Sequence, residues 1–161
     1  MMQTIAADWG DWVMFRADRK ASYKQLIIDP ADQATAIIAL KHPGANRRYG
    51  FVTRTLIFGA AAAVLRYNVI SRLLVALVIR YMGIALVCYF DDFAATIRPT
   101  LGQEPLDAFA LFCSLMGFQL EEQKSDVGPS AVFLGRLGSY RCADNGGELS
   151  ISPPGEKRVK W

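Results

Sequence analysis

Apolar and polar positions in the first third of the chain predict two strand-forming regions. Residues 12–17 (WVMFRA) are short, apolar and β-prone, and they end at Asp18. We therefore expect a strand with this aspartate at its carboxyl-terminal edge. The β-rich runs 34–40 and 49–58 flank the turn-forming sequence KHPGANRR, which predicts a β-hairpin.

Residues 59–82 predict one long helix, because the run is rich in Ala and Leu and has no internal Gly or Pro. Gly83 is placed to end it. At helical spacing Arg66, Arg72 and Arg80 fall within one arc of about 120°. The remaining surface is almost wholly apolar, so we expect a mostly buried helix with an arginine stripe. These arginines leave no uncharged run of the ~18–20 residues that a membrane span needs.

The second half of the chain predicts a strand, a tight turn at the two aspartates, and a return strand. Further along, the pattern predicts a helix ended by Gly117 and three short strands. The expected ranges are strands 84–90 and 93–97, helix 104–116, and strands 118–120, 131–137 and 148–152. This order predicts an α+β fold, an antiparallel sheet with two helices packed on one face plus a β-hairpin insertion. In such a sheet, Asp18 lies beside the aspartate pair on adjacent central strands.

Composition narrows the class of protein. The 161 residues are 52% hydrophobic and 20% charged, which is typical of one globular domain, and the net charge of +3 permits a polyanionic partner without requiring one. Cys88, Cys113 and Cys142 form no C-x-x-C spacing, so neither a disulfide framework nor a zinc site is indicated. The single histidine, His42, is expected to be a loop residue, which disfavours a His-dependent triad. The first twelve residues lack the pattern of a signal peptide, and we expect an intracellular protein of the cytoplasm or nucleus.

Candidate chemistry centres on the sequence LVCYFDDFA, in which Asp91 and Asp92 interrupt an apolar run. Repulsion and desolvation oppose such a pair, so it lies either at a solvated turn or against a positive charge. Together with Asp18, three converging carboxylates suit magnesium, which prefers oxygen ligands. Two such ions activate a 3′-hydroxyl and stabilise a leaving pyrophosphate, which is nucleotidyl transfer. A plain hairpin turn, with Asp18 a solvated strand-end residue, is the alternative.

Four motifs occur in one order: ADRKASYKQL, LIFGAAAAVLRYN, YFDDF, and LGRLG after GFQLEEQKS. In this order the chain resembles the palm of a reverse transcriptase, an RNA-directed DNA polymerase, from a retroelement of the tyrosine-recombinase or gypsy-like kind. The resemblance implies an N-terminal segment at 1–11 and a palm over 12–138 with a partial fingers hairpin at about 34–57. It leaves residues 139–161 as a C-terminal strand and basic tail that ends before any thumb.

The resemblance assigns the catalytic roles residue by residue. Asp18 and Asp91 match the ligands of two Mg²⁺ or Mn²⁺ ions, and Asp92 is the partner of Asp91. The carbonyl of Arg19 is expected to face the second ion. Lys124 matches a lysine that approaches the triphosphate and protonates pyrophosphate, with a solvated loop charge as the alternative.

The resemblance also implies substrate contacts. Tyr23 matches the bulky residue that excludes a ribose 2′-hydroxyl, and so favours deoxynucleotides. Phe58 and Gly59 match a loop that contacts the nascent base pair and the incoming nucleotide. Tyr89 and Phe90 match residues that brace the turn near the primer end. Core packing is the alternative for Tyr23 and Phe58, and residues 133–135 (FLG) match the primer grip.

Three positions depart from the family pattern. Ile57 and Ala63 stand where proline is usual, and Arg19 stands where an apolar residue is usual. The expected partners are an RNA or DNA template with primer and deoxynucleoside triphosphates, without a membrane. Fingers, thumb and RNase H regions of a larger polyprotein complete the expected enzyme, so this chain is expected to give little or no processive synthesis by itself.

Three other interpretations remain open on the sequence. One is a non-catalytic nucleic-acid-binding α+β module, in which strand aromatics stack on bases. Another is a different two-metal palm enzyme such as a nucleotide cyclase, although YFDDF lacks the glycine-rich turn expected there. The last is a small membrane protein built around the long apolar helix.

Overall fold

The computed structural model describes residues 12–133, 136–143 and 146–152. The chain divides into two compact units, Met1–Lys20 with Ser71–Trp161, and Ala21–Ile70. The segment predicted at 1–11, residues 153–161 of the basic tail and two residues of the FLG sequence lie outside the described residues.

The first unit is built on a four-stranded antiparallel sheet of order β4-β5-β1-β6. Its strands are β4 (Leu86–Tyr89), β5 (Asp92–Ile97), β1 (Val13–Asp18) and β6 (Asp126–Gly128). The predicted α+β class with antiparallel strands is therefore confirmed. Strand β6 was not predicted, because its short sequence DVG has no hydrophobic alternation and its pairing with β1 alone defines it.

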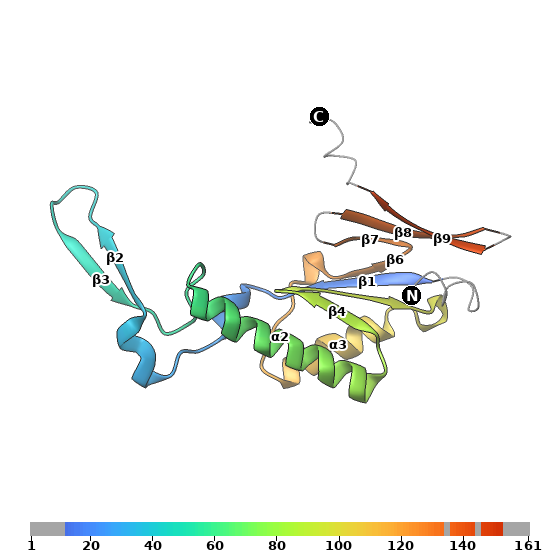
Figure 1. Cartoon of the computed structure of the whole chain (residues 1–161), viewed down its shortest axis with the longest axis horizontal. Helices are drawn as coiled ribbons and strands as arrows, with labels where there is room; N and C mark the ends of the chain where they lie inside the picture. Colours follow the sequence, from blue (N-terminus) through green and yellow to red (C-terminus); the bar gives the residue numbers. More distant parts are fainter. Residues whose placement is uncertain (1–11, 134–135, 144–145, 153–161) are drawn as a thin grey trace. The chain divides into compact units, whose positions relative to one another are not determined.

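Helix α2 (Ala61–Met82) enters this unit at Ser71. From there on, it lies with helix α3 (Glu104–Leu115) below the sheet in Figure 1. Both end as predicted, at glycines with positive φ, 66° at Gly83 and 82° at Gly117. The hydrophobic core lies between sheet and helices. There the fully buried ring of Phe109 from α3 meets Phe15 of β1 at 6.0 Å and Phe93 of β5 at 5.2 Å, between ring centroids.

The second unit holds the predicted hairpin, formed by β2 (Ile37–Lys41) and β3 (Arg48–Val52). Both strands are shorter than predicted. Residues 34 and 35 instead end the 3₁₀ helix η2 (Pro30–Thr35), whose first turn is capped by the Asp29 side chain. Every residue of both strands is exposed. His42 lies in the loop between them, as expected.

A third, three-stranded sheet follows, formed by β7 (Ser130–Phe133), β8 (Arg136–Ala143) and β9 (Gly146–Ser152). The single strand predicted at 131–137 is wrong, since the chain turns after Phe133 and returns as β8. The strand predicted at 118–120 is reduced to one isolated bridge between Arg19 and Leu120. The boundary expected after residue 138 falls inside β8.

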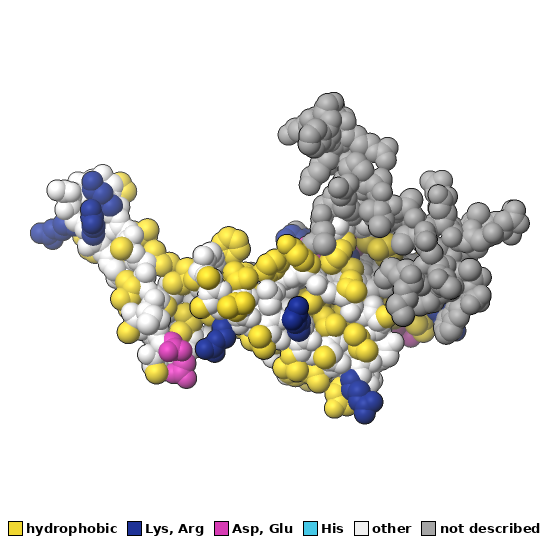
Figure 2. Space-filling view, viewed as in Figure 1, with side chains coloured by type: hydrophobic (Ala, Val, Ile, Leu, Met, Phe, Trp, Pro, Cys, Tyr) yellow, Lys and Arg dark blue, Asp and Glu magenta, His cyan; other side chains and the backbone are white. Residues whose placement is uncertain are grey.

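The prediction that α2 is mostly buried is wrong. Its buried side chains form one stripe that includes Tyr67, Leu74 and Val78, each with no exposed area. The opposite side exposes Leu65, Val69, Leu73 and Ile79, and Tyr81 is exposed in the last turn of the helix. Figure 2 shows this apolar surface, interrupted by basic side chains. A helix that is covered on a single side buries one stripe of side chains, even where its other side chains are apolar as well.

Among the described residues, α2 is the one helix long and apolar enough to cross a membrane, with mean hydropathy 1.8 over its most apolar window. Only 28% of that window is buried. Length and composition are weak evidence, because core helices of soluble proteins pass the same test.

Candidate active site

The pairing of β1 with β5 brings two of the predicted carboxylates together. Asp18, the last residue of β1, lies directly opposite Asp92, the first residue of β5. Directly opposed residues of an antiparallel pair point to the same face. Phe15 and Phe93 occupy the helix-covered face, so Asp18 and Asp92 lie on the other face. The adjacency predicted from the sequence is therefore present.

Asp91 completes the acidic group from the turn between β4 and β5. Its carbonyl oxygen accepts a hydrogen bond from the main-chain N–H of Arg19, at 3.2 Å. This bond ties the turn to the residue after Asp18. The turn itself lies one position earlier than predicted: Tyr89 pairs with Asp92, so the two turn residues are Phe90 and Asp91.

Phe90 has φ of 55°, one of two non-glycine residues with positive φ in the described part of the chain. Two-residue hairpin turns favour positive φ because it matches the twist of the strands, and glycine normally supplies it. A phenylalanine there is strained. Its ring meets the ring of Tyr89 edge-on at 4.7 Å, and Tyr89 is 53% exposed.

The charges of the three aspartates oppose one another. The pKa of Asp92 is raised, first by burial and then by the negative charges of Asp18 and Asp91. Arg16 and Lys124 lower that pKa, but the net effect remains a rise. The folded chain therefore holds carboxylates together at a cost, which is characteristic of sites built for a cation.

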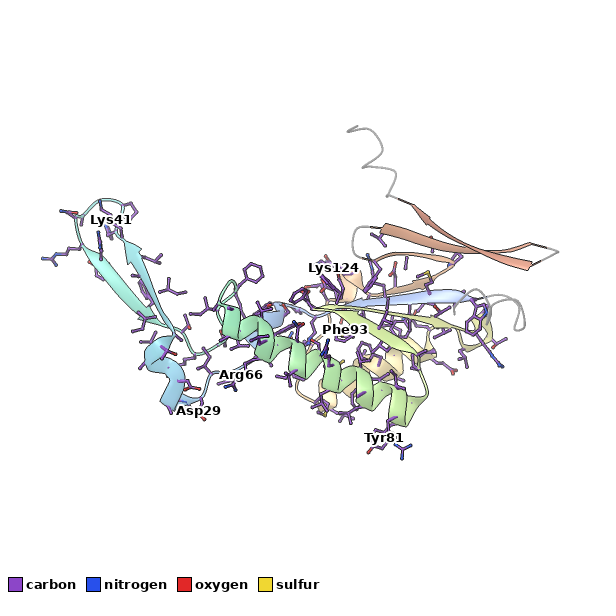
Figure 3. The ribbon with its side chains drawn as sticks, viewed as in Figure 1. Asp29, Lys41, Arg66, Tyr81, Phe93 and Lys124 are labelled. Carbon is purple, nitrogen blue, oxygen red and sulfur yellow. The ribbon has the colours of Figure 1, made fainter. Side chains whose placement is uncertain are left out.

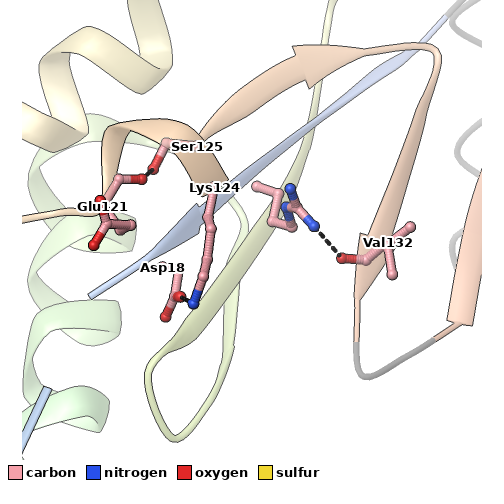
Figure 4. Close-up of polar contacts among 6 residues, drawn as sticks. Asp18, Glu121, Lys124, Ser125 and Val132 are labelled. Atoms are coloured by element: carbon pink, nitrogen blue, oxygen red, sulfur yellow. Dashed lines mark hydrogen bonds and ion pairs between the residues drawn. The ribbon is translucent and has the colours of Figure 1, made fainter. Parts of the chain in front are cut away.

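Lys124 supplies one cation. Its Nζ lies 2.5 Å from Oδ2 of Asp18, whose side chain is only 9% exposed, whereas that of Lys124 is 64% exposed (Figure 4). The hydrogen bond and charge of Asp18, followed by the charges of Asp91 and Glu121, raise the lysine pKa. Lys124 is therefore a full positive charge at neutral pH.

Backbone pairing explains the position of Lys124. The N–H of Glu121 donates to the carbonyl of Asp18 at 2.8 Å, and the N–H of Lys20 donates to that of Gln119 at 3.0 Å. The next residues form η4 (Glu122–Lys124), which turns the lysine back over the end of β1. Figure 3 shows Lys124 on one side of the sheet and Phe93 on the other.

The donor set fits a hard divalent cation in its chemistry, since carboxylate oxygens are the ligands that magnesium and manganese prefer. The described residues contain no group of three His, Cys, Asp or Glu side chains arranged to hold a metal ion. The ammonium of Lys124 occupies an oxygen of Asp18 instead. Asp18, Asp91 and Asp92 are the residues that would hold an ion at this position.

The side chain of Arg19 makes contacts that its expected role, which concerned only its carbonyl, does not include. Its side chain is 2% exposed and lies on the helix-covered side, with the guanidinium carbon 4.9 Å from the ring centroid of Phe118 and 5.6 Å from that of Phe93. Its Nη2 donates to Oγ of Ser71 at 2.6 Å. The sequence-based prediction covered only the carbonyl of Arg19 and missed Ser71. The signal was there, because Ser71 is a polar residue within the buried stripe of α2.

The expected nucleotide contacts lie in the second unit. Tyr23 is 8% exposed and stacks on Tyr67 at 4.5 Å, while Phe58 meets it edge-on at 5.4 Å. Phe58 is 82% exposed, so the core-packing alternative does not describe it. Gly59 has φ of 92° and open space where a Cβ would stand. Within this unit, the structure brings Tyr23 and Phe58 together.

Comparison with protein-family models and with curated proteins does not assign this chain to a family. No protein-family model matches the chain, and no curated protein matches it. The arrangement of these residues is therefore the basis for a functional proposal.

Asp92→Asn is expected to raise the melting temperature in chelator at pH 7 by about 1–3 °C, because it removes a partly buried charge and its repulsion by Asp18 and Asp91. The raised pKa of Asp92 in the folded chain fixes the sign of the pH dependence. Below about pH 4 Asp92 is protonated in both the folded and the unfolded chain, so it does not destabilise the fold. The destabilisation develops as the pH rises through the pKa of Asp92 in the folded chain. The gain should therefore vanish in acid. Thermal melts at pH 3.5 and 7 measure this, and a lower melting temperature of the variant at pH 7 would show that the charge of Asp92 does not destabilise the fold.

Proposed function

We propose that this chain is the palm of an RNA-directed DNA polymerase, which adds deoxynucleotides to a primer 3′-hydroxyl on an RNA or DNA template. The observation that carries the proposal is the pairing of Asp18 with Asp92 on neighbouring strands, with Asp91 in the adjoining turn. A chain gains no stability from gathering these charges, so a function that uses them is the better explanation.

In this proposal Asp18 and Asp91 hold two Mg²⁺ or Mn²⁺ ions, with Asp92 beside them. Bound ions supply activation of the 3′-hydroxyl and neutralisation of charge on the phosphates. Lys124 holds a proton and a positive charge beside this group, which suits contact with a triphosphate and proton donation to pyrophosphate. The exposed ring of Phe58 offers a stacking surface for a base, and Tyr23 is the bulky residue that would exclude a 2′-hydroxyl.

A single-turnover assay tests the proposal. The full chain is mixed with a primer–template and one complementary deoxynucleoside triphosphate, in Mg²⁺, in Mn²⁺ or in chelator. We expect one-nucleotide extension with either metal and none in chelator. A single addition needs only positioning and chemistry, so it does not depend on processive synthesis. Nucleic-acid binding without metal-dependent addition would contradict the proposal.

Lys124→Met is expected to raise affinity for Mn²⁺ about three- to tenfold, because a competing ammonium leaves Asp18. In chelator the variant should melt lower than the wild type, since the buried carboxylate loses its partner. Titration calorimetry measures the affinity, with Lys41→Met in the hairpin as a matched control. Unchanged or weaker Mn²⁺ binding would show that Lys124 does not compete with metal.

A metal-independent nucleic-acid-binding module is the second candidate. The contact of Lys124 with Asp18 favours it, because this ion pair already neutralises one of the proposed ligands. Binding of a primer–template that is equally tight in chelator and in Mg²⁺, with no nucleotide addition, would select this candidate.

A further inference from the structure

Two buried polar side chains beneath the acidic turn have no role in the proposed chemistry. Arg19 is 2% exposed and Ser71 is 1% exposed, among side chains that are otherwise apolar. Burying an arginine is costly unless its charge and its N–H groups are used. The contacts of this pair show where the Nη2 group is used.

The two residues form a directional relay to the turn. Arg19 Nη2 donates to Ser71 Oγ at 2.6 Å, and Ser71 Oγ donates to the carbonyl oxygen of Phe90 at 2.9 Å. The direction is fixed because a guanidinium only donates, and a hydroxyl has a single proton, which must then go to Phe90. The charged donor also polarises the hydroxyl, which strengthens the second bond.

The carbonyl that receives this bond belongs to the strained residue. Phe90 has φ of 55°, a conformation that costs free energy for a residue with a side chain and persists only where the surroundings hold it. Arg19 holds the same turn a second time, through its main-chain N–H on the carbonyl of Asp91. Consecutive carbonyls of the turn are therefore both tied to Arg19, one directly and one through Ser71.

We propose that Arg19 and Ser71 are positioning residues that hold the Phe90–Asp91 turn in its strained conformation and so keep Asp91 and Asp92 beside Asp18. This inference rests on the proposed function, since the turn matters for activity only if the aspartates bind metal. Arg19 stands where the reverse transcriptase pattern usually has an apolar residue. In this proposal its side chain supports the acidic turn from the helix-covered side of the sheet.

The test is a double-mutant cycle between Ser71→Ala and Phe90→Gly, read by Mn²⁺ titration calorimetry on the full chain. Ser71→Ala should weaken Mn²⁺ binding about tenfold. Glycine adopts positive φ without strain, so in the Phe90→Gly background the same substitution should weaken binding less than about threefold. An equal loss in both backgrounds, or no loss in either, would overturn the proposal.

A matched control separates positioning from general destabilisation. Thr53→Val removes another partly buried hydroxyl-to-carbonyl bond, from Thr53 Oγ1 to the carbonyl of Ala36 at 3.2 Å in the second unit. It should shift the urea midpoint without changing Mn²⁺ affinity. Loss of affinity in this control as large as that in Ser71→Ala would count against a positioning role.

The cycle also distinguishes failure of the relay from failure of the proposed function. If the wild type binds no Mn²⁺, the proposed metal site fails, and the relay is judged by urea unfolding of the same four proteins. Ser71→Ala should then raise the unfolding equilibrium constant about tenfold with Phe90 present and less than about threefold in the Phe90→Gly background. Equal effects in the two backgrounds would overturn the relay as well.

Discussion

Asp18→Asn is expected to weaken Mn²⁺ binding at least about a hundredfold and to remove single-nucleotide addition. The magnitude follows because loss of a residue that only orients a metal ligand already costs about 10–100-fold, and Asp18 is proposed as a ligand itself. The substitution keeps the shape of the side chain and removes its charge. Calorimetry with Mn²⁺ and the one-nucleotide extension assay measure the two effects.

Asp126→Asn is the matched control for this charge change. Asp126 lies on β6, the other neighbour of β1, and its Oδ1 lies 3.4 Å from Nε of Arg16. The same loss of one negative charge near the sheet should change Mn²⁺ affinity by less than about threefold, because the Asp126 side chain is 58% exposed and paired with Arg16, and solvent and salt screen an exposed charge. If Asp18→Asn behaved like Asp126→Asn, Asp18 would not be a metal ligand.

Phe109→Ala is expected to lower the free energy of unfolding by about 3–5 kcal/mol. Phe109 has no exposed area, and its ring joins α3 to the rings of Phe15 and Phe93 on the two central strands. Alanine would leave a cavity between helix and sheet. Urea unfolding followed by circular dichroism measures the change.

Leu111→Ala on the same helix is the control, since Leu111 is 63% exposed. Its effect should stay within about 0.5 kcal/mol, as for most surface substitutions. Similar losses for Phe109→Ala and Leu111→Ala would mean that α3 does not pack on the sheet through Phe109.

Much of the fold could be predicted because local signals and tertiary structure agree. Glycines end both long helices where expected, and the apolar runs around Asp18 and the aspartate pair became neighbouring strands. Prediction failed where strand pairing or tertiary packing, and not local composition, determines the structure. Strand β6 exists through its bonds to β1, and the exposure of α2 depends on how many sides of the helix are covered.

The candidate site likewise contains residues that the sequence could predict and contacts that it could not. Asp18, Asp91 and Asp92 stand out in sequence because carboxylates are conspicuous in apolar runs, and strand pairing brings them together. Ser71 stands out locally as a polar residue within the buried stripe of α2. Its contact with Arg19 joins positions far apart in the chain and depends on which side of the sheet Arg19 faces, so no local pattern reveals the partner. The contact of Lys124 with Asp18 depends likewise on pairing of the 119–121 segment with β1.

Anomalous X-ray scattering from crystals of the full chain grown with Mn²⁺ would locate the metal ions themselves. We expect Mn²⁺ bound to carboxylate oxygens of both Asp18 and Asp91, with the ammonium of Lys124 displaced from Asp18. Crystals in saturating Mn²⁺ that show no ion there, with Lys124 still paired to Asp18, would rule out the metal site and with it the proposed polymerase.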